Sequence, residues 1–105
     1  MWIRMPGLMV SVTHKIGREA ALARMRPFLD AISRDYAHEI SDLQSHWHDY
    51  RIDFIFTARG LQVQGTIVVE EDAVYVSGPS QLAVLLFRDR IESTIQQELE
   101  KLLSN

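Results

Sequence analysis

The stretch "RIDFIFTARGLQVQGTIVVEEDAVYVS", residues 51–77, decides the fold of this 105-residue chain. In three successive runs nearly every second residue is apolar, beginning with Ile52, Phe54 and Phe56. A period of two is typical of strands with one buried face, because successive side chains point to opposite faces of a sheet. Gly60 and the acidic segment "EED" separate the runs, so the sequence predicts an antiparallel meander.

Two further runs of the same period lie upstream, so five strands are predicted, at residues 9–13, 43–48, 51–59, 61–70 and 73–77. In the second of these, Leu43 and Trp47 share the face that we expect to be buried. His46 and His48 share the opposite face, which we expect to be polar and wet.

The apolar spacing changes to three and four residues from residue 18 onward, which indicates an amphipathic helix of about five turns. Pro27 lies inside it and lacks the N–H that would bond the carbonyl of Ala23, so we expect a kink there. Helical spacing returns in residues 81–105, with three acidic residues predicted on the solvent side: Glu92, Glu98 and Glu100. An unbroken helix of that length would span about 37 Å, longer than the sheet is wide, so a break near residues 88–90 is expected.

The predicted architecture is an α+β two-layer sandwich, with a five-stranded, mainly antiparallel sheet and two helices on one face. The element order is strand, helix, four strands, helix. We place the first strand beside the last, followed by the fourth, third and second. Residues 1–8 are interpreted as an N-terminal extension and residues 9–105 as a single domain. Three apolar residues on the outer sheet face would suit a homodimer: Ile55, Val68 and Tyr75.

Composition narrows the classes of partner. The net charge is −3, and eleven Lys and Arg are scattered among fourteen Asp and Glu, so nucleic acid is not expected as a partner. The chain has no cysteine, which suits the cytoplasm. Its longest apolar run, "LAVLLF", is far shorter than the roughly 20 residues of a membrane span, so no transmembrane segment is predicted.

The histidines are the residues most suggestive of chemistry. His46 and His48 point the same way from one strand and could share a zinc ion, but no third ligand has a spacing that places it beside them. His14 lies at the corner before the first helix, where the single Gly17 does not make a phosphate-binding loop. We therefore predict no metal site, no cofactor and no catalytic residue.

Two groups of residues are candidates for contact with an apolar partner. The run at residues 82–87 cannot place all its side chains on one side of a helix, so it is a candidate surface, formed by Leu82, Val84, Leu85, Leu86 and Phe87. A candidate cavity between helices and sheet lies where a missing side chain leaves room, formed by Gly65, Trp47, Phe54 and Phe56.

A resemblance extends over nearly the whole chain from Val10. It is carried by Leu43 with Trp47 and by the segments "HKIGREAA", "RIDFIF", "GTIVVEEDAVYV" and "LAVLLFRDRIESTIQQELEKLL". In these features the chain resembles the polyhydroxyalkanoic acid system family, small bacterial proteins associated with the genes for storage-polyester granules. The resemblance implies no catalytic residue. His46, His48 and the segment "GPSQ" depart from the pattern expected of the family.

Three functions follow as hypotheses. The resemblance implies a non-enzymatic accessory protein of polyhydroxyalkanoate storage in the cytoplasm, at the granule surface. The alternative is a carrier or sensor of a small apolar ligand, because the predicted architecture looks like a reduced helix-grip domain. An enzyme is the least favoured, since only scattered His and Asp residues are available for it.

Overall fold

The computed structural model describes residues 9–58, 60–78 and 88–104. Its elements, in chain order, are β1 (Met9–Thr13), α1 (Arg18–Ala23), α2 (Met25–Asp35), β2 (Ile40–His48), β3 (Arg51–Ala58), β4 (Leu61–Val69), β5 (Ala73–Ser77) and α4 (Arg88–Leu103). The strands form one antiparallel sheet in the order β1-β5-β4-β3-β2. The predicted fold class and strand order are both confirmed.

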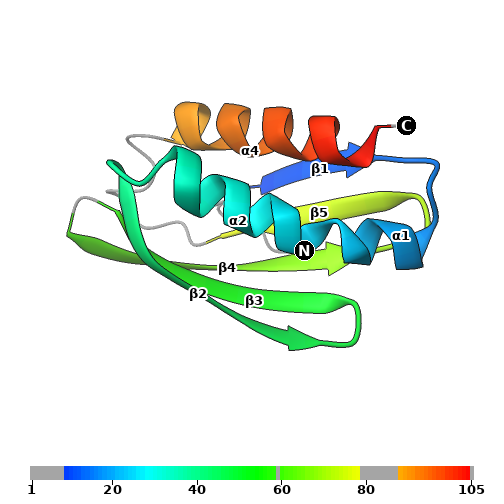
Figure 1. Ribbon diagram of the computed structural model, residues 1–105, viewed down its shortest axis with the longest axis horizontal. Coiled ribbons are helices and arrows are strands. Elements are labelled where there is room, and N and C mark those ends of the chain that lie inside the picture. Colours follow the sequence, from blue (N-terminus) through cyan, green and yellow to red (C-terminus); the bar gives the residue numbers. More distant parts are fainter. Residues whose placement is uncertain (1–8, 59, 79–87, 105) are drawn as a thin grey trace, which may run out of the picture.

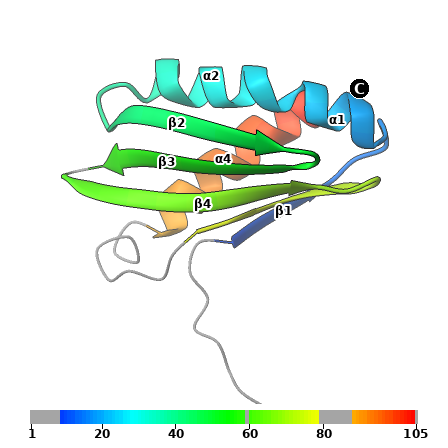
Figure 2. The same cartoon turned by 90° about the horizontal axis from the view of Figure 1, so that it is seen from below.

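Both helical segments cover the same face of the sheet (Figure 1). The helix α4 contacts β1 and α2, while α2 contacts the opposite edge strand β2. Figure 2 shows the meander of β2, β3 and β4 from another side, with the helices again together on one face. The fold therefore has two layers and leaves the second face of the sheet without a covering element from the described part of the chain.

The core lies between the layers and follows the predicted alternation. Ile52 pairs with Ile67 across β3 and β4, and neither side chain is exposed to solvent. Val76, the partner of Ile67, continues this apolar row into β5, and Val69 pairs with Val74 in the next row. From the helices, the buried contributions are Ala21, Met25, Phe28, Leu29, Ile95, Leu99 and Leu103. Burial of these side chains, at about 25 cal/mol per Å² of apolar surface, is the main force that joins the two layers.

The first helical segment breaks three residues before Pro27. Arg24 separates α1 from α2 with φ −84° and ψ −5°, and Pro27 is the third residue of α2. In the first turn of a helix the missing N–H of proline costs no hydrogen bond, because that N–H has no partner within the helix. The predicted kink is therefore present, but it lies at the residue after Ala23, where the proline ring would crowd a continuous helix.

Arg24 at this break also ties the two helical segments together. Its Nη1 donates to the carbonyl oxygens of Leu102 at 2.8 Å and Ser104 at 3.0 Å. These carbonyls lie at the C-terminal end of α4, where a cation and a donor are both favourable. The break thus supplies a cap for the last helix.

Glu98 is not on the solvent side of α4, so that prediction is wrong. It is only 9% exposed. Because α4 contacts both β1 and α2, its buried face is wider than one apolar stripe and includes this position. Lys101 Nζ lies 3.2 Å from Glu98 Oε2 and compensates the charge.

The second strand begins three residues earlier than predicted. Its pairing with β3 shifts register between Ser41 and Gln44, and Asp42 adopts a positive φ of 57°. This bulge lets Ile40 and Leu43 both pack against the core although they are three residues apart. A strict period of two cannot detect such a strand end.

Some predictions fall outside the described residues. These are the N-terminal extension at residues 1–8 and the candidate apolar surface of Leu82, Val84, Leu85, Leu86 and Phe87. Of the helices that the structure describes, none combines the length and apolar character needed to cross a membrane.

Candidate functional site

The sheet face opposite the helices carries two rows of side chains that cross the strands. One row, which we call the Asp53 row, consists of successive cross-strand partners: Ser77, Thr66, Asp53 and His46. The second, the Ile55 row, consists of Gln64, Ile55 and Gln44. Between the rows lie Ser45, Phe54 and Gly65. Because side chains alternate along a strand, these three residues present backbone to the outer face.

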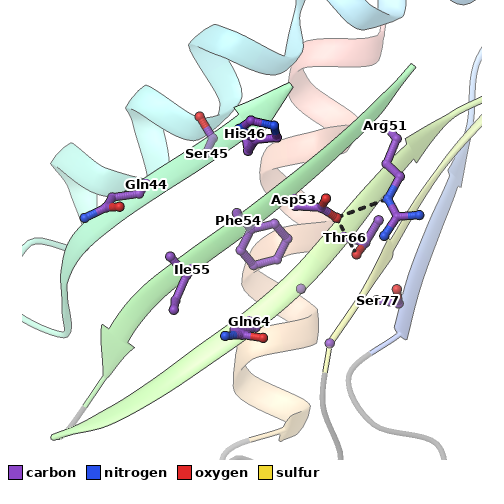
Figure 3. A pocket seen from close by; sticks show the side chains of 12 residues that line it. Gln44, Ser45, His46, Arg51, Asp53, Phe54, Ile55, Gln64, Thr66 and Ser77 are labelled. Carbon is purple, nitrogen blue, oxygen red and sulfur yellow. Dashed lines mark hydrogen bonds and ion pairs between the residues drawn. The ribbon is translucent and has the colours of Figure 1, made fainter. Parts of the chain in front are cut away.

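A hollow of about 780 Å³ lies between these rows and opens to solvent. We call it the outer hollow. Figure 3 shows its side chains with the helices behind the sheet. It is lined by Gln44, Ser45, His46, Arg51, Asp53, Phe54, Ile55, Gln64, Gly65, Thr66, Ser77 and Gly78. Residues from four adjacent strands therefore converge on one site.

Asp53 makes two side-chain hydrogen bonds within the outer hollow. Its carboxylate accepts hydrogen bonds from Arg51 Nε and from Thr66 Oγ1, each at 3.1 Å (Figure 3). The hydrogen bond from Arg51, followed by that from Thr66, lowers the pKa of Asp53 below its ordinary value. At neutral pH the hollow thus contains a carboxylate paired with a guanidinium. The other polar groups that line it are uncharged amides and hydroxyls, and the imidazole of His46.

The two histidines on β2 are both exposed, as predicted. His46 is the partner of Asp53 and His48 is the partner of Arg51. His48 Nε2 lies 3.8 Å from Asp49 Oδ2. Among the described residues, no group of three or more His, Asp or Glu side chains is placed to hold a metal ion.

Of the four residues of the candidate cavity, Gly65 and Phe54 line the outer hollow, while Trp47 and Phe56 do not. Phe54 and Phe56 are buried between the layers, with ring centroids 6.0 Å apart. A Cβ at Gly65 would lie 2.4 Å from Phe54 Cζ, so the phenyl ring occupies the room left by the missing side chain. A cavity between the layers stays a prediction of the sequence.

Trp47 is half-buried at the edge of the core. Arg26 of α2 lies over its ring, with 4.6 Å from the guanidinium carbon to the centroid. Its Nε1 donates to Ser45 Oγ at 3.0 Å. The tryptophan therefore joins β2 to α2, as an anchor of the core edge should.

His14 is a buried structural residue at the corner between β1 and α1, with 6% exposure. Its Nδ1 accepts from the backbone N–H of Ile16 at 3.4 Å, and its Nε2 lies 3.1 Å from the carbonyl oxygen of Glu70. A neutral imidazole with the proton on Nε2 satisfies both contacts. The ring thus links the corner to the end of β4, and both ring nitrogens are already engaged.

A second polar cluster lies at the same end of the sheet as His14. Arg18 lies 4.6 Å from the centroid of the Tyr50 ring, and its Nη2 donates to Glu70 Oε1 at 3.3 Å. Tyr50 in turn donates its hydroxyl to Glu19, and this hydrogen bond is the main cause of a raised pKa at Tyr50. The cluster joins α1 to two turns of the meander, so we read it as structural.

These observations define a class of protein: a small α+β sandwich with one helix-covered sheet face and one face that bears a polar hollow and that none of the described elements covers. A family model described as "Putative polyhydroxyalkanoic acid system protein" matches residues 8–103. The chain belongs to this family, and the resemblance predicted from its sequence is confirmed. The family description names no reaction. No curated protein and no solved structure matches the chain.

The sequence did not single out most of the hollow. Gln44, Gln64 and Thr66 are ordinary polar residues at alternate strand positions, and nothing in their spacing along the chain brings them together. Only the pairing register of β2, β3 and β4 does so. Of the lining residues, the sequence singled out Gly65 and Phe54 as candidate contacts, and it placed them in a cavity between the helices and the sheet.

Proposed function

We propose that this chain is a non-enzymatic accessory protein of polyhydroxyalkanoate storage that attaches to the surface of cytoplasmic storage granules. The observation that carries the proposal is membership of the polyhydroxyalkanoic acid system family over residues 8–103. Storage polyester is an apolar polymer, so a protein that resides on it needs an apolar contact surface.

The proposed contact is the run of Leu82, Val84, Leu85, Leu86 and Phe87. Six consecutive apolar residues exceed what one buried helix face requires, which favours contact of some of them with a partner. Arg88 and Arg90 follow directly and suit the polar rim of such a contact. Attachment of this kind is hydrophobic and is therefore expected to resist salt.

Co-sedimentation with amorphous polyhydroxybutyrate particles tests the proposal. The wild-type chain is expected to pellet with the particles across a salt series, while an unrelated soluble protein stays in the supernatant. Leu85→Glu and Phe87→Glu are expected to weaken pelleting. Leu61→Glu is the matched control, because Leu61 is 41% exposed and lies at the start of β4.

Two results would count against the proposal in different ways. Pelleting that disappears at high salt would mean that attachment is electrostatic, not apolar. Equal pelleting of the wild type, the two glutamate variants and the control would remove residues 82–87 as the contact surface.

A further inference from the structure

We propose that the outer hollow binds a linear oligoester of hydroxyacyl units, which lies across the strands between the Asp53 row and the Ile55 row. The choice of polyester as the ligand rests on the proposed function.

The shape of the hollow suits a thin, extended chain. Its lining residues come from four adjacent strands, β2, β3, β4 and β5. Strands are spaced by about 4.8 Å, so the trough between the rows is roughly 14 Å long. Its floor is backbone at Ser45, Phe54 and Gly65, which keeps the middle of the trough free of outward side chains.

The Ile55 row supplies hydrogen-bond donors and an apolar side chain, which match the groups of an oligoester. An ester offers carbonyl and ether oxygens, which accept hydrogen bonds, so it needs donors in the site. Gln44 and Gln64 are exposed, and each carboxamide has two N–H donors. Ile55 lies between them as the cross-strand partner of both, and its half-buried side chain can contact the alkyl groups of the ligand.

The charge of the hollow favours a neutral ligand. Arg51 and Asp53 neutralise each other through the 3.1 Å contact between Arg51 Nε and the carboxylate. Thr66 also directs its hydroxyl hydrogen to Asp53. With its cation paired, the site offers no net field to attract a polyanion, which fits an uncharged oligoester better than a nucleotide or a polyphosphate.

The hollow also adjoins the proposed granule contact in the sequence. Ser77 and Gly78 line one end of the hollow, and Leu82 is four residues after Gly78. The two proposed contacts are therefore neighbours in the sequence.

Titration of the full chain with the methyl ester of a linear 3-hydroxybutyrate trimer, followed by isothermal calorimetry and by amide NMR, tests this site. We expect the amide resonances of His46, Asp53 and Thr66 to shift. Gln64→Leu removes one neutral donor and is expected to weaken binding by roughly threefold to tenfold. Gln62→Leu is the matched control, because Gln62 is exposed on the same face of the same strand but does not line the hollow.

Each outcome decides the proposal. Equal affinities of the two leucine variants, or trimer binding that shifts only resonances far from the hollow, would overturn it. Particles that sediment the protein although the trimer does not bind would also overturn it, and would leave the proposed function standing. Trimer binding at the hollow without sedimentation would support the site and count against granule attachment.

Discussion

The two faces of β3 and β4 both carry apolar residues, but these residues differ in their exposure to solvent. On the inner face Ile52, Ile67 and Val69 are fully buried under the helices. On the outer face Ile55 and Val68 are only half-buried, and Tyr75 of the neighbouring strand is 43% exposed. The comparison separates two environments along one strand, since the inner residues are held by packing, whereas the outer residues are partly accessible to solvent.

The largest expected effect tests the inner face directly. Ile67→Ala should lower the free energy of unfolding by about 2–5 kcal/mol, because it removes buried methyl groups and leaves a cavity in the core. Val68→Ala, the next residue on the outer face, should cost less than about 1 kcal/mol. Urea denaturation of both variants measures the difference, and similar losses would contradict the assignment of the two faces.

The second prediction concerns Gly65, whose missing side chain leaves room for the ring of Phe54. Gly65→Ala should destabilise the fold by about 3 kcal/mol, because its Cβ would lie 2.4 Å from Phe54 Cζ and 2.5 Å from the carbonyl oxygen of Ser77. Combining it with Phe54→Leu should restore only part of the loss, since the contact with Ser77 is to backbone. A fully neutral Gly65→Ala in thermal denaturation would be inconsistent with this packing.

The same contrast between buried and exposed positions holds for two histidines, His14 and His38. His14→Ala should cost about 2 kcal/mol, because two hydrogen bonds to backbone groups of Ile16 and Glu70 are lost in a buried corner. His38→Ala should have almost no effect, since His38 is exposed in the turn before β2. Chemical denaturation distinguishes them, and equal stabilities would show that His14 is not a structural link.

The smallest expected effect is electrostatic and lies in the outer hollow. The pKa of Asp53 is lowered in the folded chain by its hydrogen bonds from Arg51 and Thr66. A depressed folded pKa contributes stability that is present above the unfolded value and is lost as the pH falls through the folded value. Carbon-detected NMR titration should show the pKa of Asp53 rising in Arg51→Met, and a pKa that does not change would rule out the pairing in solution.

The sequence predicted the fold well because packing against one helical layer imposes a period of two on each strand. Ile52, Phe54 and Phe56 show this period, and their burial is confirmed. The errors occur where another interaction interrupts the period. Asp42 introduces a bulge in β2, and Glu98 is buried because α4 contacts two neighbours.

The outer hollow was harder to predict for a physical reason. No buried contact fixes the type of residue at Gln44, Gln64 or Thr66, so these positions carry no pattern beyond polarity. Their common location depends on the exact register between neighbouring strands of the meander, including the shift in β2, and on Gly65 leaving room for Phe54 beneath the trough.

Histidine labelling on the polymer tests whether the sheet face opposite the described helices meets polyester. Diethyl pyrocarbonate would be applied with and without amorphous polyhydroxybutyrate particles, and acylation followed at exposed His46 in the hollow and exposed His38 near the helices. We expect the particles to protect His46 and to leave His38 reactive. Protection of His38 alone, or no protection of either in sedimented protein, would contradict it.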